Sequence, residues 1–247
     1  MKKLITLCAA LALVAFVGTT KAQNLLTDGN LDAGTDGGGV IPGWNIQSFK
    51  DLSGPIGDVI TLQAFVTIPP VTGPPDLGGF VKAFQGGAQH PTPPAQADYA
   101  NLNLTQDVAG TVGQKYRLSG MIGAGANYSG LLAGTPTQTQ LAIDFDNDNN
   151  PDNGVINFAQ LDVQAAGLTS GGGPAFGAKL FSITGTAPIG TVSVRARFSA
   201  LEMFNTTNPD PAAFIDDFSL TKVPEPATIT LGLLAAVGMF GLARRKS

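Results

Sequence analysis

Apolar and polar residues alternate along four short segments of the chain, which is the pattern of a β-strand with one buried face. In TVSVRARFS (191–199), the apolar residues fall on one side of the strand: Val192, Val194, Ala196 and Phe198. The polar residues fall on the other side: Ser193, Arg195 and Arg197. The same alternation occurs in three further segments: KYRLSGMIG (115–123), QLAIDFD (140–146) and FIDDFSL (214–220).

The segments between these strands are rich in residues that form turns. Gly, Asn, Asp, Thr and Pro abound, and residues 69–79 and 86–94 are long Pro/Gly-rich loops. No segment of the body has the extended apolar periodicity of a helix. We therefore predict that residues 23–222 form one all-β domain, a β-sandwich.

The first 22 residues are organised like a secretory signal peptide. A basic start, Met1 to Lys3, precedes the apolar stretch 4–17, and small residues precede a predicted cut before Gln23. Cys8 is the only cysteine, so the exported chain would contain no thiol. Disulfides, cysteine catalysis and thiolate metal sites are thereby excluded for the body.

The other end carries one apolar run followed by bases. Residues 227–243, 17 in number, are all apolar, Gly or Thr, which is near the lower limit for a helix that crosses a ~30 Å hydrocarbon core. A soluble helix would show a polar face, and this run has none. We predict a transmembrane helix over 227–243, opened by Pro226 and stopped on the cytoplasmic side by Arg244, Arg245 and Lys246.

The triplet Pro224-Glu225-Pro226 stands directly before this run. The signal peptide, the secreted body, VPEP, the short apolar helix and ARRKS together resemble the PEP-CTERM class of bacterial surface proteins. The resemblance implies that the segment 223–247 is a sorting signal, read by an exosortase, and that the helix is cut away near the triplet. It also implies a Gram-negative host, a transient intermediate in the inner membrane, and a final place on the cell surface or in the extracellular matrix.

The body is acidic and offers few residues for catalysis. Residues 23–222 contain 17 acidic and 8 basic residues, a net charge of −9, which argues against nucleic acid or anionic lipid as its partner. His90 is the sole histidine, and Glu202 is the only glutamate of the body. Ser/His/Asp, zinc and paired-carboxylate hydrolase arrangements lack support, so we predict that the chain is not an enzyme.

Four phrases, in this order, resemble the galactose-binding-like jelly rolls found in carbohydrate-binding modules: NLLTDGNLDAG (24–34), IPGW (41–44), LNLTQDVAGTVGQKYRLSG (102–120) and AFIDDFSL (213–220). The resemblance implies a jelly-roll β-sandwich over about residues 24–222. This chain has Leu31-Asp32 where that family usually has Phe-Glu, and it contains long Pro-rich insertions.

The same resemblance implies a structural Ca²⁺ between the first and last strands, held by carboxylates at Asp32 and Asp216. The alternation of FIDDFSL predicts that Asp216 shares a face with Phe218, where a buried carboxylate would be costly unless a hard cation bound it. The alternative is that Asp216 lies at the rim of the sheet, reaches water and accepts backbone N–H bonds.

A second acidic stretch is DFDNDNNPDNG (144–154). It begins like a calcium loop, but it lacks the Gly and the Glu that an EF-hand needs at fixed positions. We interpret it as a hairpin turn whose Asn and Asp side chains bond their own backbone, with a weak surface calcium site as the alternative.

A glycan-binding platform needs an exposed aromatic ring. Trp44 is the only tryptophan; it follows Pro-Gly at the start of a strand and is predicted to pack in the core rather than to bind a sugar. Tyr99 and Tyr128 are predicted to be better exposed, and they are the candidate ligand-binding residues.

These features define one leading hypothesis and two alternatives. The leading hypothesis is a secreted, exosortase-sorted surface or matrix protein whose structural or adhesive β-sandwich contacts exopolysaccharide or biofilm. The first alternative is a true carbohydrate-binding module with a defined glycan site. The second, remote alternative is a glycan hydrolase.

Overall fold

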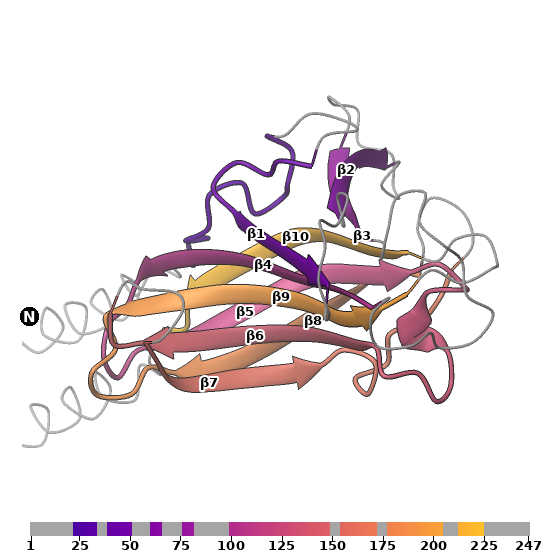
Figure 1. Ribbon diagram of the computed structural model, residues 1–247. Coiled ribbons are helices and arrows are strands. Elements are labelled where there is room, and N and C mark those ends of the chain that lie inside the picture. Colours follow the sequence, from indigo (N-terminus) through magenta and orange to yellow (C-terminus); the bar gives the residue numbers. More distant parts are fainter. Residues whose placement is uncertain are drawn as a thin grey trace, which may run out of the picture.

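The computed structural model describes residues 22–33, 39–50, 60–65, 76–81, 99–148, 154–171, 177–204 and 212–224. These residues form two five-stranded antiparallel sheets that lie face to face (Figure 1). The strands are β1 (Asn45–Lys50), β2 (Ile60–Phe65), β3 (Asp76–Val81), β4 (Ala100–Ala109), β5 (Lys115–Ala124), β6 (Gln138–Asp146), β7 (Val155–Asp162), β8 (Lys179–Thr186), β9 (Ser193–Met203) and β10 (Ala213–Lys222).

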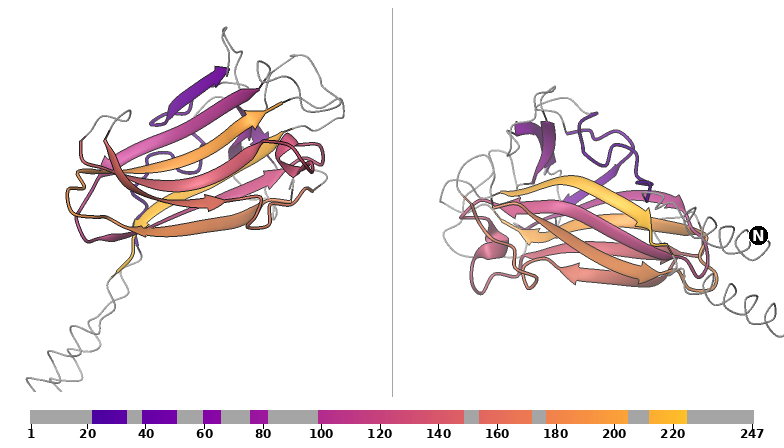
Figure 2. Two further views of the ribbon diagram at one scale, coloured as in Figure 1. Left: turned by 60° about the horizontal axis from the view of Figure 1, so that its bottom comes forward. Right: turned by 180° about the vertical axis from the view of Figure 1, so that it is seen from behind.

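The first sheet has the strand order β1-β4-β9-β6-β7, and the second sheet has the order β2-β3-β10-β5-β8. Strands that are distant in the sequence are therefore neighbours, such as β4 with β9 and β5 with β10. The views in Figure 2 show the two layers from other sides. The predicted all-β jelly-roll sandwich is confirmed, and the only helical element among the described residues is a short 3₁₀ turn, η2 (Ser129–Leu131).

The core lies between the sheets and is built by the predicted alternation. Leu141, Ile143 and Phe145 of β6 are buried against residues such as Tyr116 and Leu118 of β5. On β9, the predicted inward set is confirmed for Val194, Ala196 and Phe198, whereas Val192 precedes the strand and is 45% exposed. Close packing of these side chains is the main stabilising contribution that the alternation provides.

The alternation prediction also fails within β10. The register with β5 shifts between Asp216 and Ser219, and Asp217 has a left-handed backbone with φ of 50°. Such a β-bulge adds one residue and reverses the side-chain alternation beyond it. Ile215 and Phe218 both enter the core, whereas Asp216 is only half-buried. The prediction that Asp216 shares a face with Phe218 is therefore wrong.

Several sequence predictions lie outside the described residues. These are the signal peptide up to residue 21, His90, most of the sorting triplet, the transmembrane helix 227–243 and the basic tail. Within the described part of the chain, no helix combines the length and the apolar character needed to span a membrane.

Candidate glycan-binding groove

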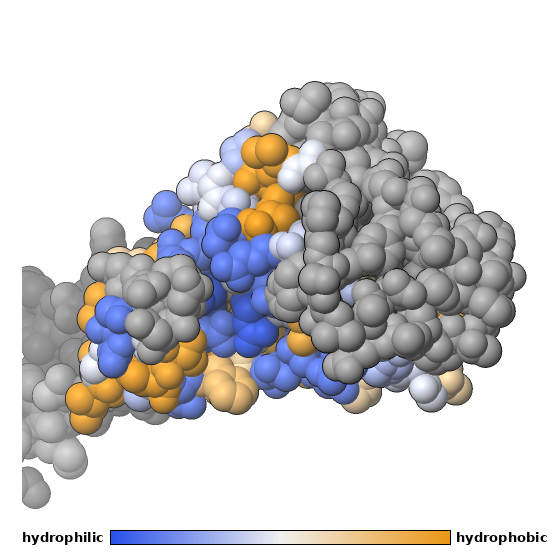
Figure 3. Space-filling model, viewed as in Figure 1, coloured by the Kyte–Doolittle hydropathy of each residue, from blue (hydrophilic) through white to orange (hydrophobic). Residues whose placement is uncertain are grey.

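The outward face of the first sheet carries a shallow polar hollow of about 300 Å³, which we call the polar groove. It crosses the sheet from the edge strand β1 to the edge strand β7, and hydrophilic residues gather across the middle of this face in Figure 3. Its lining residues are the outward members of the same alternation that builds the core: Gln47, Asn103, Thr105, Asp144, Val155, Phe158, Gln160, Arg195 and Arg197.

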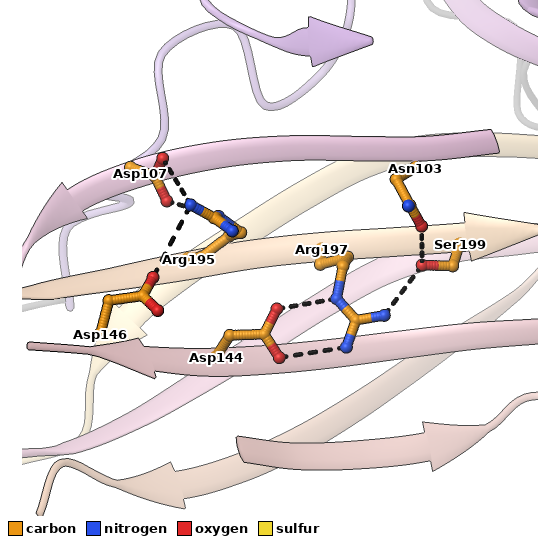
Figure 4. A network of polar contacts seen from close by, with 7 residues as sticks. All are labelled: Asn103, Asp107, Asp144, Asp146, Arg195, Arg197 and Ser199. Carbon is orange, nitrogen blue, oxygen red and sulfur yellow. Dashed lines mark hydrogen bonds and ion pairs between the residues drawn. The ribbon is translucent and has the colours of Figure 1, made fainter. Parts of the chain in front are cut away.

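Arg197 and Asp144 form a two-pronged ion pair at the centre of the groove. Arg197 Nε donates to Asp144 Oδ2 at 2.7 Å, and Nη2 donates to Oδ1 at 3.0 Å. Nη1 donates to Ser199 Oγ at 3.0 Å, and that hydroxyl donates to Asn103 Oδ1 at 2.7 Å (Figure 4). Each guanidinium edge is thus engaged, so the orientation of this side chain is fixed by its partners.

A second arginine, Arg195, is 6% exposed and lies between two carboxylates. Its Nε donates to Asp107 Oδ1 at 2.8 Å and its Nη2 to Asp107 Oδ2 at 3.2 Å, while Nη2 lies 3.7 Å from Asp146 Oδ2 (Figure 4). Neighbouring strands place these residues side by side, because Asp107 of β4 is paired in register with Arg195 of β9. The groove therefore rests on two charge clusters that span β4, β9 and β6.

Asp146 differs from the other two carboxylates. It is 1% exposed, and neither of its carboxylate oxygens has a hydrogen-bond partner. Burial raises the pKa of Asp146, and the charges of Asp107, Asp144 and Asp148 raise it further, while Arg195 opposes the shift. An ionised carboxylate is therefore held here at a cost in free energy.

Phe158 supplies the aromatic surface of the groove. The residue is 59% exposed, and it is paired in register with Asp144 on the neighbouring strand. The ring therefore stands beside the central ion pair. Sequence reasoning restricted to Trp and Tyr missed this residue, although period-two counting in VINFAQLD places Phe158 on the same face as the polar Gln160 and Asp162.

The predicted ligand-binding tyrosines are not exposed, so that prediction is wrong. Tyr128 is 0% exposed, its hydroxyl hydrogen-bonds to Thr139 Oγ1 at 2.9 Å, and burial raises its pKa to about 12. Tyr99 is 8% exposed and packs edge-on against Phe204. Neither ring offers a face to a ligand in solution.

The core prediction for Trp44 is confirmed. The residue is 8% exposed, its ring centroid lies 5.3 Å from that of Phe218, and its Nε1 donates to the backbone oxygen of Asp28 at 3.0 Å. This tryptophan ties the first segment of the chain to the last strand.

The predicted calcium residues belong to two segments that the structure brings together. Phe218 N donates to Gly29 O at 2.6 Å, which places the 28–32 turn beside the bulge that contains Asp216. Asp28 Oδ1 accepts from Ala33 N, whereas Oδ2 is buried without a hydrogen-bond partner.

Burial, together with the nearby charge of Asp32, raises the pKa of Asp28. A buried, unpartnered carboxylate oxygen suits a hard cation that takes oxygen ligands. Among the described residues, however, no three acidic or histidine side chains converge on one point. Calcium binding between the 28–32 turn and the β10 bulge therefore stays a prediction.

The two strands that flank the acidic stretch 144–154 pair as the hairpin interpretation predicted, whereas residues 149–153 between them lie outside the described residues. β6 and β7 pair antiparallel across it, and Asn147 N donates to Gly154 O at 2.9 Å. Asp144 and Asp146 face arginines of β9 and are not directed into a calcium loop.

Comparison with known proteins identifies a sorting motif at the C-terminal end of the chain. Residues 222–247 match the PEP-CTERM protein-sorting motif, which implies an exported protein that an exosortase processes. The last strand, β10, leads directly into this motif, and Pro224 is the only residue of the triplet within the described chain. No curated protein matches the chain in sequence.

Several solved structures resemble the sandwich. The carbohydrate-binding module TmCBM61 in complex with beta-1,4-galactotriose has a TM-score of 0.45 at 13% identity, with 82% of this chain and 100% of that chain covered. A cyclase from Fischerella sp. TAU has a TM-score of 0.49 at 14% identity, covering 83% and 100%.

The enzymatically active domain of a tailspike protein from bacteriophage CBA120 has a TM-score of 0.45 at 14% identity, with 78% of this chain but only 22% of that chain covered. These structures include a binding module and enzymes. No ligand or activity follows for this chain from likenesses this distant.

Proposed function

We propose that this chain is an exported glycan-binding protein that holds a neutral sugar chain in the polar groove. The observation that carries the proposal is the exposed ring of Phe158 next to a fixed array of hydrogen-bonding side chains. A structural or adhesive role in contact with exopolysaccharide would use the same groove, with the matrix polymer as the ligand.

The ring and the array match the two kinds of surface that a sugar presents. A pyranose ring has an apolar face of C–H groups, and an exposed aromatic ring such as Phe158 can cover it. Its hydroxyl groups need donors and acceptors in pairs, which the amides of Gln47, Asn103 and Gln160 and the Arg197–Asp144 pair supply.

The polar side chains are already ordered before any ligand arrives. Arg197 is held by Asp144 and Ser199, and Ser199 is held by Asn103. Side chains fixed in this way lose little conformational entropy on binding, and this loss is one of the main costs of association.

The charge of the groove favours a neutral ligand. Three carboxylates (Asp107, Asp144 and Asp146) stand against two guanidinium groups, Arg195 and Arg197. The balance is negative, so a polysaccharide of uronic acids would be repelled. We therefore expect neutral hexose or pentose polymers to bind best.

The same pairing favours binding without hydrolysis. A glycosidase needs one carboxyl group as acid and a second as nucleophile or base. Both oxygens of Asp144 accept from Arg197, and both oxygens of Asp107 accept from Arg195. These carboxylates act as anchors for the arginines.

The binding proposal is tested on the exported chain with a panel of soluble neutral and acidic polysaccharides, followed by calorimetry with the best ligand. Phe158→Ala should weaken binding about tenfold, because loss of one stacking contact costs about 1.4 kcal/mol. Leu180→Ala is the matched control, since Leu180 is 66% exposed but lies on β8 of the second sheet. Unchanged binding by Phe158→Ala, or equal loss in both variants, would refute the groove as the binding site.

The destination of the protein is part of the same proposal. We expect an exosortase to read Pro224-Glu225-Pro226, to remove the C-terminal segment and to release the sandwich to the cell surface or matrix. Glu225→Ala should leave a full-length form in the inner membrane of the native host. Mass spectrometry of the mature C-terminus would show normal removal if the triplet were only a linker.

A further inference from the structure

Three chain segments meet at one end of the sandwich, where β10 leads toward the sorting motif. The β4–β5 turn bonds to the β8–β9 turn through Gly113 N to Ala187 O at 2.8 Å. It also bonds to the end of β10, because Gln114 Nε2 donates to Val223 O at 3.0 Å. This is the left-hand end of Figure 1, at which the arrow of β10 terminates.

Exposed aliphatic side chains gather at this end, which we call the apolar end. Ile189 is 91% exposed, Val112 50% and Val192 45%. Ile156, which is 40% exposed, lies beside Gly190 of the same β8–β9 turn. Figure 3 shows hydrophobic surface at this end of the molecule. Single exposed apolar residues are ordinary, but turns are normally polar, and a cluster on neighbouring turns indicates an interaction surface.

The transmembrane helix predicted over 227–243 would place a bilayer next to this end. Pro224 is three residues from the start of the apolar run at 227, so the connection reaches at most about 11 Å. A polar headgroup layer is about 5–8 Å thick on each side. A helix of 17 residues would be about 26 Å long, shorter than a ~30 Å core, and this mismatch draws its start inward.

We propose that, before its C-terminal segment is removed, the sandwich rests on the membrane with Val112, Ile189 and Val192 inserted among the lipid headgroups. The proposal goes beyond glycan binding and uses none of the groove residues. The lipid surface is the expected occupant of the apolar end, because the short tether leaves no room for a protein layer between this end and the bilayer.

The charges of the body make the contact between the apolar end and the lipid depend on the C-terminal anchor. Lys115 and Lys222 are exposed at this end and suit anionic headgroups. The body as a whole carries −9, and Asp148 is exposed on the β6–β7 hairpin of the first sheet. We therefore expect the contact to centre on the β8–β9 turn, to form only while the chain is anchored, and to be lost on cleavage.

The test uses the exported chain, residues 23–247, reconstituted into vesicles of phosphatidylcholine with phosphatidylglycerol, and of phosphatidylcholine alone. This chain has no cysteine, so Ile189→Cys carries one environment-sensitive fluorophore. Leu180→Cys is the matched control, because it is exposed near the opposite end of β8. We expect a blue shift and several-fold stronger quenching by bromolipid for the probe at 189, with no such change at 180.

Two outcomes would overturn the proposal. One is equal quenching of both probes by a water-soluble quencher, with no effect of bromolipid. The other is a blue shift at 189 that disappears when the vesicles carry about one chain each, which would assign the apolar end to contact between two copies. Ile189→Asp in a chain labelled at Val112→Cys should return that probe to an aqueous spectrum, whereas Leu180→Asp should not.

Discussion

The polar groove lies on one sheet and the apolar end on the turns between the two sheets, and both reverse the usual distribution of residues. In the groove, charged and amide side chains lie in the middle of β4, β9 and β6, and several are buried. At the apolar end, turns that would normally be polar expose Val112, Ile189 and Val192. The buried charges of the groove cost free energy of desolvation, and the apolar end leaves aliphatic side chains in water. Each feature is unfavourable in the isolated chain, which suggests that each is retained for a contact outside the chain.

The largest expected effect comes from breaking the ion pair of the groove. Arg197→Leu leaves Asp144, 4% exposed, without its partner, and removal of one member of a buried pair costs about 3 kcal/mol. The melting temperature should fall by roughly 10 °C for a domain of this size. Restoration of most of this loss in Arg197→Leu/Asp144→Leu would identify the isolated charge as the cause, and an unchanged melting temperature of the single variant would contradict the pairing.

Calcium should give the next largest effect. We propose that an ion at the 28–32 turn binds only the folded chain, so Ca²⁺ at about a hundredfold excess over its dissociation constant would stabilise it by about 2.7 kcal/mol. Chelation should lower the melting temperature, and Asp32→Asn and Asp216→Asn should each remove the response. A melting temperature indifferent to Ca²⁺ in the unaltered chain would leave these carboxylates as ordinary strand-end residues.

Asp146 should show a smaller effect with a defined pH dependence. Its pKa is raised in the folded chain above the ordinary value of 3.8, so its contribution to stability is full below that value and declines as the pH rises through the folded pKa. Asp146→Asn should therefore raise the free energy of unfolding by about 1 kcal/mol at neutral pH. The gain should vanish at or below the ordinary pKa, and a gain that persists there would disprove the electrostatic explanation.

The smallest effect is expected at the apolar end. Ile189 is 91% exposed, so Ile189→Ser should change the free energy of unfolding by less than about 0.5 kcal/mol. Denaturant unfolding of the exported chain would measure it. A larger loss would show that the aliphatic side chain supports the fold and is not reserved for an outside contact.

The sequence pattern predicted the inward faces of β5, β6 and β9 because period-two alternation follows directly from strand geometry. It missed the reversal at Asp216, since a bulge depends on one left-handed residue, Asp217, that alternation cannot reveal. It also placed Tyr128 in solution because its loop is rich in Gly and Ser, whereas tertiary packing buries the ring and Thr139 satisfies its hydroxyl.

The sequence pattern predicted only part of the groove. The alternation put Arg195 and Arg197 on the outward face. Their hydrogen-bonded carboxylate partners are distant in the sequence: Asp107 is 88 residues from Arg195, and Asp144 is 53 residues from Arg197. Such long-range pairing is fixed by sheet order, which a single sequence does not reveal. Phe158 could have been found by asking which aromatic residue falls on a polar face.

The most direct test of the glycan-binding claim is an amide NMR titration of the exported chain with the best neutral oligosaccharide from the polysaccharide panel. Our account predicts that shift changes concentrate on β4, β9, β6 and β7 around Asn103, Arg197 and Phe158, and that Phe158→Ala suppresses them. Changes that instead concentrate on the second sheet, or on the turns at the apolar end, would contradict the groove as the glycan site.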